Sequence, residues 1–445
     1  MNLTPALQLF IRSLERNEWQ QFLRNAARVI TILSLGSAQS ESATIILRAA
    51  RLGAPTSTNP FCRLRSLTFV KVDLELASYL PVVLSNSLRS IQLRSCSRTV
   101  VNIILGHVGH LCPRIQILSA IAIPPGASGV LLRLTSLRRL LCTRVEYTST
   151  VLSHLSMLPT LEEMRVSLPD MHSITGIRSS TAFPSLKKLH LVVTTDYKPL
   201  TPLLRSVQST LLLTLELSMH LPVLPDLVSM TELLAGISRF STLQSLDITF
   251  YRDQDDNLVD YNILPLCALR DLRHVEIHNI PISMDNQSIH AFGKAWPNLE
   301  FLDFGPIAST VTVAYVTELT LEALALFATY FPKLGYLDIA LDATAPPTTH
   351  LLPRSLKPII LRLERSPLDP RTWPDVAAYI SAIYPMADGS WYRIYDDVGE
   401  VVENWGKKRW TDIARLVPII TGARREGEER AESLHAKEGQ REEGQ

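Results

Sequence analysis

Pro297-Asn-Leu299-Glu-Phe-Leu302-Asp-Phe304 contains a short motif, beginning at Leu299, with apolar residues at its first, fourth and sixth positions. The same spacing occurs thirteen times along the 445 residues, at intervals of 22 to 35 residues. A repeat of this length indicates a stack of supersecondary units, none of which can bury its apolar face alone. The first apolar positions of the copies are Ile30, Leu64, Leu88, Ile115, Leu137, Leu161, Leu186, Leu212, Leu243, Leu272, Leu299, Leu334 and Leu356.

Each copy predicts one strand and each interval predicts a helix. The last two apolar positions alternate with polar residues, as at Leu189 and Leu191, which is typical of a strand with one buried face. Helical spacing follows in the intervals, for example in 42–51, 99–105 and 320–331, and several intervals end before a proline, where helical geometry is disfavoured. Because parallel crossovers keep one hand, we predict an α/β solenoid with a curved parallel sheet on its concave side and helices on its convex side.

The motif resembles the leucine-rich repeat over roughly residues 28–365. The copies that follow an aromatic residue and proline are similar to those of fungal F-box proteins with degenerate leucine-rich repeats, and 18–29 is similar to the linker after the F-box. The resemblance implies a substrate receptor of a cullin-based ubiquitin ligase, in which the F-box docks the cullin adaptor and the repeats hold the substrate. No F-box is visible in this chain, so a stand-alone repeat scaffold that does not recruit ubiquitination machinery is the alternative.

The repeats also depart from the regular pattern at the turn that follows each strand. Regular repeats place Asn or Cys there, but only Cys96 matches. We therefore expect a packed turn, without a ladder of side-chain hydrogen bonds. The positions equivalent to Cys96 hold Val72, Ile123, Val145, Thr194, Ile280 and Ile307.

The same pattern predicts four segments along the chain. Residues 1–28 form an N-terminal helical cap or linker with an absent or truncated F-box, and 29–365 form the repeat array. Residues 366–421 break the period and contain four of the six tryptophans, Trp373, Trp391, Trp405 and Trp410, which is typical of a terminal cap. Residues 422–445 have almost nothing to bury, so we expect a disordered, charged tail.

Composition excludes several classes of function. Forty-four basic and 43 acidic residues give a net charge of +1, which offers no global field for nucleic acid or an anionic membrane. Five cysteines without a Cys-x-x-Cys pair suggest neither a disulfide framework nor a zinc site. No catalytic or cofactor-binding motif occurs, so we predict no enzyme activity, no catalytic residue, no cofactor and no metal. We find no secretory signal and no membrane-length apolar run, which favours the cytoplasm or the nucleus.

The candidate binding residues lie between and beside the last two apolar positions of each copy. Five consecutive copies carry a carboxylate there, and earlier copies are basic, with Arg94 among them. Equivalent positions on neighbouring parallel strands lie about 4.8 Å apart, where like charges repel by about 1 kcal/mol per pair even in water. The predicted concave protein-binding face comprises Arg139, Arg165, Lys188, His190, Glu216, Asp247, Glu276, Phe301, Asp303, Tyr336 and Asp338.

Two interpretations of this face stay open. In the first, the carboxylates bind a Lys/Arg-rich segment of a protein partner, because complementary charge speeds association and suppresses wrong partners. In the second, they point into solvent and pair with neighbours such as Arg273 or His274. The strand register is also open near Ile115, Leu137 and Leu212, where runs of apolar residues allow a shift by one position.

Overall fold

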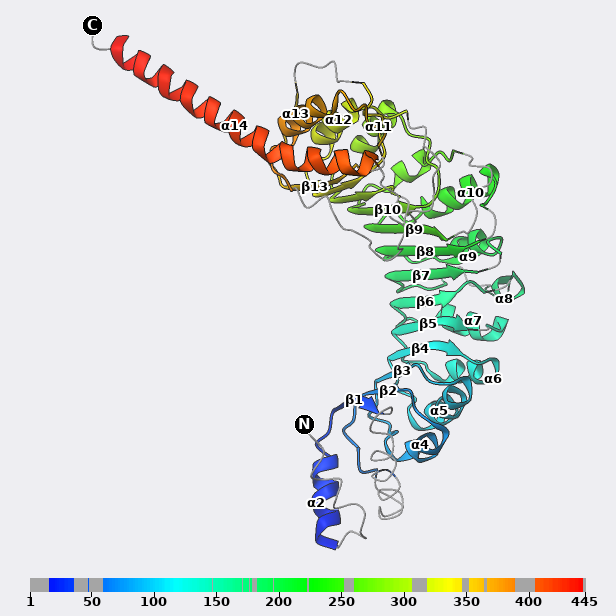
Figure 1. Ribbon diagram of the computed structural model, residues 1–445. Coiled ribbons are helices and arrows are strands. Elements are labelled where there is room, and N and C mark those ends of the chain that lie inside the picture. The colour runs from blue at the N-terminus through cyan, green and yellow to red at the C-terminus, as the bar shows by residue number, and fades with distance from the viewer. Residues whose placement is uncertain are drawn as a thin grey trace. The chain divides into compact units, whose positions relative to one another are not determined.

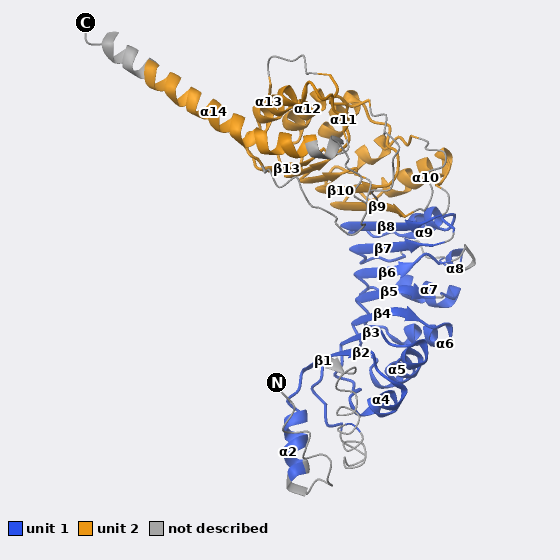
Figure 2. Ribbon diagram, viewed as in Figure 1, with its two compact units in different colours: residues 1–221 blue, residues 222–445 orange. Residues whose placement is uncertain are grey.

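The protein is described here by a computed structural model. It covers two compact units, 1–221 and 222–445 (Figure 2). In both units, strands alternate with helical connections (Figure 1). The residues that the structure describes are 16–35, 47, 59–145, 147–169, 171–175, 177, 182–194, 196–221, 224–251, 260–305, 318–345, 352–363, 366–388 and 405–442.

In unit 1, each strand pairs in parallel with the next one along the chain. Its strands are β1 (Thr31–Leu35), β2 (Ser66–Val70), β3 (Ser90–Arg94), β4 (Ile117–Ile123), β5 (Arg139–Val145), β6 (Glu163–Ser167), β7 (Lys188–Val193) and β8 (Thr214–His220). Its helices are α2 (Arg16–Ala26), α4 (Leu74–Tyr79), η3 (Leu80–Val82), α5 (Arg98–Leu111), α6 (Pro125–Ser128), η4 (Gly129–Arg133), α7 (Ser149–Met157), α8 (Met171–Thr175) and α9 (Leu200–Ser206).

Unit 2 follows the same plan, with parallel pairing in sequence order. Its strands are β9 (Ser245–Tyr251), β10 (His274–His278), β11 (Phe301–Asp303), β12 (Tyr336–Asp338), β13 (Ile359–Arg362) and β14 (Ala387–Asp388). Its helices are α10 (Leu227–Ile237), η5 (Leu264–Ala268), α11 (Asn286–Ala295), α12 (Glu322–Tyr330), α13 (Trp373–Ile383) and α14 (Trp405–Glu442).

The architecture is that of an α/β leucine-rich-repeat solenoid, as predicted. The thirteen motif copies correspond one to one to β1–β13, and β14 is an additional short strand. In unit 1 the connecting helices α4–α9 lie on one side of the strands (Figure 1). The predicted helical segments 99–105 and 320–331 fall in α5 and α12, whereas 42–51 lies outside the described residues apart from Leu47.

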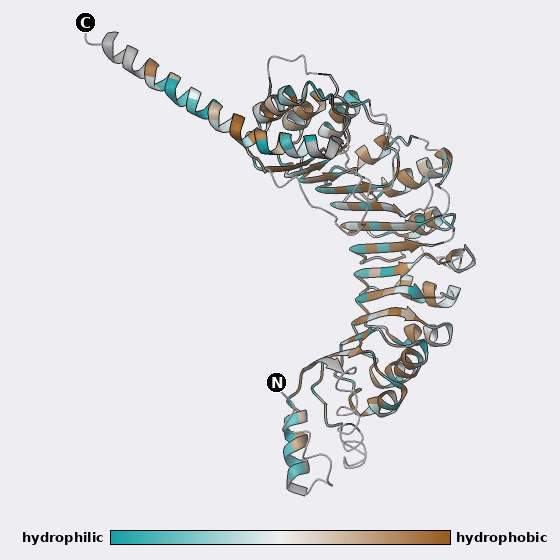
Figure 3. Ribbon diagram, viewed as in Figure 1, coloured by the Kyte–Doolittle hydropathy of each residue, from teal (hydrophilic) through white to brown (hydrophobic). Residues whose placement is uncertain are grey.

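The core is built from the apolar motif positions and from the apolar faces of the helices. Leu186, Leu189 and Leu191 are buried in one copy, and the equivalent residues of most other copies are buried in the same way. Figure 3 shows the alternation along the strands, with apolar residues between polar ones. Each fully buried Leu side chain stabilises the fold by about 1.5–3 kcal/mol relative to an exposed one. The stack of leucines is therefore the main source of stability.

Polar caps and prolines set the helix ends. The side chains of Asp73, Ser97, Thr148, Asp226 and Asp285 accept hydrogen bonds from backbone N–H groups in the first turns of α4, α5, α7, α10 and α11. Such caps satisfy donors that have no partner within the helix. At the other end, the residue before proline leaves the helical region, as Trp296 does with φ −119° and ψ 59°. The predicted stop before proline is confirmed.

The expected packing of the turns after the strands is found at four of the six equivalent positions, whereas Thr194 is exposed and Ile307 lies outside the described residues. Val72, Ile123, Val145 and Ile280 are buried. At β10 a hydrogen bond of the ladder type is nevertheless present, because the side-chain amide of Asn279 donates to the backbone carbonyl of Phe250 at 2.7 Å. The expectation of turns without any such bond is therefore wrong at β10.

The strand register agrees with the predicted one in the copies that start at Ile115, Leu137 and Leu212. It differs from the prediction in the first and the last copy. Leu118 pairs with Leu140 in the assigned register, and Leu215 is fully buried. At β13, however, Leu337 pairs with Leu361, two residues later than the motif that starts at Leu356 requires. Leu356 is accordingly 70% exposed, and Leu363 lies in the core.

The first copy also departs from its assigned register. Ile32, rather than Leu33, pairs with Leu67, and the pairing is irregular beyond it. Ile30, the first apolar position assigned to that copy, is 50% exposed. Both deviations occur in the first and the last copy of the motif.

The C-terminal segment is helical where a disordered tail was expected. Helix α14 continues to Glu442. Ion pairs between residues one turn apart line it, with Arg425 Nε 3.9 Å from Glu429 Oε1 and Arg430 Nη2 3.7 Å from Glu426 Oε2. Such pairs, together with the high helix propensity of Ala, Glu and Arg, favour a helix without an apolar face. A shortage of apolar residues therefore does not by itself predict disorder in this segment, because helix propensity and ion pairs act in the opposite direction.

Candidate functional site

The outward side chains of the strands form two rows on the face opposite the buried leucines, which we call the strand face. The first outward row lies two residues after the first apolar position of each copy, and the second outward row lies four residues after it. In unit 1 the pairing places Thr68, Gln92, Ser119, Leu141, Arg165, His190 and Glu216 in register in the second row. In unit 2 it aligns Asp247, Glu276, Asp303, Asp338 and Arg362.

In unit 1 the carboxylates of the rows pair with neighbouring cations. Arg139 Nε lies 3.2 Å from Glu163 Oε2, and His190 Nδ1 lies 2.7 Å from Glu216 Oε2. The hydrogen bond from His190, followed by the charges of His190 and Arg165, holds the pKa of Glu216 below its usual range. Glu216, predicted as the start of an acidic half, thus belongs to a mixed-charge cluster in unit 1.

A hollow of about 610 Å³ opens on the strand face of unit 1, over β3–β8. Arg94, Arg165 and Lys188 line it together with the paired Glu163 and Glu216. Ile121 and Leu141 supply an apolar part of the lining, and Ile121 is 58% exposed. The hollow therefore brings four of the predicted site residues, Arg165, Lys188, His190 and Glu216, into one concave surface. Arg139, the fifth from unit 1, borders it through its contact with Glu163.

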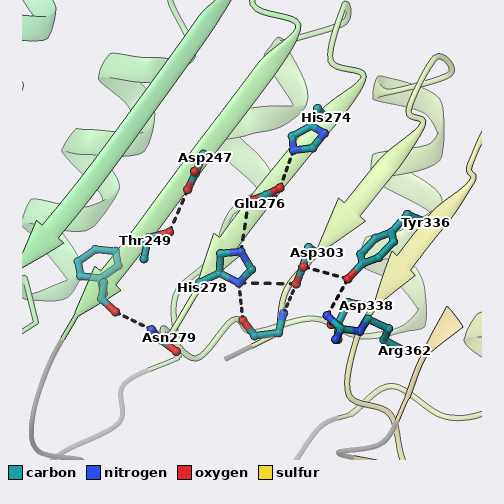
Figure 4. A network of polar contacts seen from close by, with 12 residues as sticks. Asp247, Thr249, His274, Glu276, His278, Asn279, Asp303, Tyr336, Asp338 and Arg362 are labelled. Atoms are coloured by element: carbon teal, nitrogen blue, oxygen red, sulfur yellow. Dashed lines mark hydrogen bonds and ion pairs between the residues drawn. The ribbon is translucent and has the colours of Figure 1, made fainter. Parts of the chain in front are cut away.

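In unit 2 a network of polar contacts centres on Glu276 and His278 (Figure 4). His274 Nε2 donates to Glu276 Oε1 at 2.7 Å, and His278 Nε2 lies 3.4 Å from Glu276 Oε2. The hydrogen bonds from His274 and then His278 lower the pKa of Glu276 to about 2. The second interpretation of the face expected its carboxylates to pair with Arg273 or His274. His274 does pair with Glu276 of the second outward row, whereas Arg273 pairs with Glu300.

His278 is a buried cation that the sequence analysis did not identify. Its Nδ1 donates to the carbonyl of Gly305 at 2.7 Å and lies 3.6 Å from Asp303 Oδ1. Burial lowers the pKa of His278, but the hydrogen bond to Glu276, the charge of Asp303 and the bond to Gly305 outweigh it and raise this pKa to about 9. His278 is therefore charged at neutral pH and compensates the carboxylates on both sides.

Asp303 and Asp338 are buried, contrary to the exposed positions expected for them. The N–H of Gly305 donates to Asp303 Oδ1 at 2.9 Å, and the Tyr336 hydroxyl lies 3.4 Å from Oδ2. Arg362 Nη1 lies 3.5 Å from Asp338 Oδ2. Burial, above all, raises the pKa of Asp303. The uncompensated acidic row is thus replaced by a network in which His278 and Arg362 supply positive charge.

The first outward row of unit 2 is aromatic. The rings of His274 and Phe301 stack with centroids 4.1 Å apart, and those of Phe301 and Tyr336 stack at the same distance with planes 3° apart. Phe301 and Tyr336 were predicted as anchors beside the carboxylates, and the structure does place them there. Because the faces of the Phe301 and Tyr336 rings contact each other, it is the edges of the rings that are partly exposed on the strand face.

The residues that the structure describes contain neither a candidate metal site nor a membrane-spanning helix. They contain no group of three or more His, Cys, Asp and Glu side chains that could hold a metal ion. Within the same residues, no helix has both the length and the apolar character that crossing a bilayer requires.

Comparison with known proteins gives only remote similarities. No protein-family model matches the chain, and no curated protein matches it. Among solved structures, an internalin from Listeria monocytogenes is similar at 13% identity, with 81% of each chain covered and a TM-score of 0.39. A leucine-rich-repeat protein from Leptospira interrogans is similar at 14% identity, with 82% of this chain and 97% of that chain covered and a TM-score of 0.34.

A plant receptor is also similar. It is the leucine-rich-repeat ectodomain of the membrane receptor kinase GASSHO1/SCHENGEN3 from Arabidopsis thaliana, in complex with CASPARIAN STRIP INTEGRITY FACTOR 2. The identity is 10%, the coverage is 74% of this chain and 39% of that chain, and the TM-score is 0.35. At TM-scores this low, the fold assignment rests on the strand order and register of the chain itself.

Proposed function

We propose that this chain is a non-enzymatic recognition protein whose strand face binds another protein. The observation that carries the proposal is the hollow of about 610 Å³ in unit 1, where charged and exposed apolar side chains lie together on the strand face. Protein interfaces combine an apolar centre with a polar rim in this way. Ile121, which is 58% exposed, and the partly exposed Leu141 supply the apolar part of this surface.

Site-directed photo-crosslinking tests this proposal with a matched control. A photoreactive residue replaces Ile121 on β4 in one variant and Met157 on α7 in another, positions that are 58% and 60% exposed. Both variants are irradiated in an extract of the source cells. We expect a discrete crosslinked protein from position 121 and none from position 157. Equal crosslinking from both positions, or crosslinking from 157 alone, would refute binding at the strand face.

The resemblance to F-box proteins supports a more specific use, as the substrate receptor of a cullin-based ubiquitin ligase. A stand-alone scaffold uses the same strand face without recruiting that machinery. Incubating the full chain with a purified cullin adaptor separates the two, because only a receptor retains the adaptor. We propose both uses for the cytoplasm or nucleus, where free thiols are ordinary, and all five cysteines are free.

We also propose that the accessible carboxylates of unit 2 favour a Lys/Arg-rich segment of the partner. Asp247 and Glu276 are partly exposed, and the second outward row contains four carboxylates against Arg362 and the neighbouring His278. Binding of an oligolysine peptide to Asp247→Asn measures this preference, with Asp271→Asn as a control on an exposed turn residue. We expect weaker binding only for Asp247→Asn. Equal binding by both variants and the wild type would reject the preference.

A further inference from the structure

The described residues that line the hollow in unit 1 carry more cations than carboxylates. Its carboxylates are both engaged, Glu163 with Arg139 and Glu216 with His190. Arg165 and Lys188 are exposed and form no hydrogen bond or ion pair with any residue that the structure describes. Within the described part of the chain, the Arg94 side chain donates only to the neutral Gln92, at 3.0 Å. Because every carboxylate of the hollow is already paired and these three cations are not, the surface offers its free charge to an anion.

The cations are arranged in two groups. Arg165 on β6 pairs in register with His190, and Lys188 on β7 pairs with Glu163, so the two cations lie on adjacent strands, two residues apart along the strand direction. Arg94 lies on β3, three strands away from β6. Neighbouring strands are about 4.8 Å apart, so about 14 Å separates the groups across the sheet, which is the span of about four residues of extended chain.

Apolar side chains lie between the two cationic groups. Ile121 on β4 is 58% exposed, and Leu141 on β5 is partly exposed. Both line the hollow. A ligand that crosses from Arg94 to Arg165 must therefore pass over an apolar surface, which favours a chain with an apolar side chain between its acidic residues.

The same surface is poorly suited to nucleic acid. Glu163 and Glu216 lie among the cations and would repel a continuous phosphate backbone. None of the described residues that line the hollow is Phe, Tyr or Trp, the side chains on which unpaired bases stack. Separate carboxylates on a peptide can avoid these two positions, whereas evenly spaced phosphates cannot.

We propose that the hollow over β3–β8 binds an extended acidic peptide segment, with acidic residues against Arg94 and against Arg165 and Lys188, and an apolar side chain over Ile121 and Leu141. This inference rests on the proposed function, since it specifies the partner of the same strand face. It gives unit 1 a ligand preference opposite in charge to the one proposed for unit 2.

Fluorescence anisotropy with the full chain tests the proposal. The probe is a labelled peptide in which Leu stands between two Glu-Asp pairs, and the comparison probes replace the acids with Lys, replace Leu with Ser, or are a labelled oligothymidine. We expect binding of the acidic Leu peptide that weakens as salt is raised. The Ser peptide should bind several-fold more weakly, and the Lys peptide and the oligothymidine should not bind.

Substitutions locate the binding. Arg165→Glu combined with Lys188→Glu should weaken binding at least about tenfold, and Ile121→Ser should weaken it about threefold. Arg114→Glu, at an exposed position in the turn before β4 outside the hollow, should bind like the wild type. No binding of the acidic peptide up to millimolar concentration, equal binding of the Lys peptide or the oligothymidine, or no effect of the double substitution would overturn the proposal. Crosslinking from position 121 would then still support protein binding, so the two failures are distinguishable.

Discussion

The guanidinium of Arg362 on β13 lies 3.5 Å from Oδ2 of Asp338 on β12 and donates to the hydroxyl of Tyr336 at 3.0 Å. Both members of the ion pair are largely buried, with 19% of the Arg362 side chain and 9% of the Asp338 side chain exposed. Removing one partner of a buried pair leaves the other charge without compensation, and this costs more than the intact pair contributes. Arg362 therefore stabilises the second outward row of unit 2.

Replacing Arg362 with Met should lower the free energy of unfolding by about 3 kcal/mol, because it removes the cation beside the buried Asp338 carboxylate. Urea unfolding at neutral pH measures the loss. Arg354→Met is the matched control, since the pair of Arg354 with Glu428 is about half exposed and should contribute less than about 1 kcal/mol. Adding Asp338→Asn to Arg362→Met should recover part of the loss. Equal stability of Arg362→Met and the wild type would contradict this account.

The charge of His278 should make the stability of unit 2 depend on pH. Its pKa rises from the ordinary 6.5 to about 9 in the folded protein. Stabilisation from this group is therefore fully present below pH 6.5 and is lost as the pH rises through about 9. Between these limits we expect the free energy of unfolding to fall by roughly 2 kcal/mol. Urea titrations across this range should show the decrease in the wild type.

The variant His278→Gln tests whether this residue causes the decrease. It should be less stable at pH 6.5 and should lose most of the pH dependence up to about 9. His107→Gln, which changes a histidine in unit 1, should leave the decrease unchanged. Glu276 acts at the opposite end of the scale, because its lowered pKa gives stability that is lost only as the pH falls from 4.5 towards about 2. An identical alkaline decrease in His278→Gln and the wild type would exclude His278 as its source.

The sequence predicted the fold and the outward rows well because the leucine spacing specifies both the strands and their faces. Side chains alternate along a strand, so fixing Leu246 and Ile248 inside also fixes Asp247 outside. The same logic identified the partners in register, such as His190 and Glu216. Burial within the face could not be predicted in this way, because it depends on which side chains from other strands cover each position.

The register of β13 differs from the predicted one because its hydrophobic pattern fits two positions of the motif. Ile359, Leu361 and Leu363 alternate along the strand and are all buried. A shift of the motif by two residues therefore keeps the same face of the strand inside. The hydrophobic pattern cannot detect such a shift. In the assigned register Ile360 stood in the second outward row, and Arg362 was missed. His278 was missed for a simpler reason, since it lies two residues beyond Glu276 of the second outward row, where the alternation of His274 to His278 continues.

Gly293 on α11 should be essential to the packing of α11 against α12. A Cβ atom added there would overlap Cβ of Tyr330 and lie 2.9 Å from its Cγ. Gly293→Ala should therefore lower the free energy of unfolding by about 1–3 kcal/mol through overpacking. Gly236→Ala on α10 is the matched control, because nothing lies within 4 Å of its added Cβ. That change should stabilise the protein by up to about 1 kcal/mol through helix propensity. Thermal unfolding should give shifts of opposite sign, and shifts of the same sign would contradict the close approach.

Trp410 on α14 connects this helix to the segment around Ser366, and we propose that the described residues of 366–421, which do not include Trp391, close the array. Its side chain is buried, and its Nε1 donates to the carbonyl of Ser366 at 3.0 Å. The Ser366 hydroxyl in turn accepts from the N–H of Leu341 at 3.0 Å.

Substitution of Trp410 tests the closing role of this segment. Trp410→Ala should cost about 3–5 kcal/mol in urea unfolding and should speed proteolysis within α14, because it removes the packed ring and its hydrogen bond. Trp410→Phe keeps most of the ring and should cost about 1 kcal/mol. Leu434→Ala, on an exposed part of the same helix, should change stability by less than about 0.5 kcal/mol. If Trp410→Ala and Leu434→Ala had equal effects, α14 would make no stabilising contact through Trp410, and the segment would not close the array.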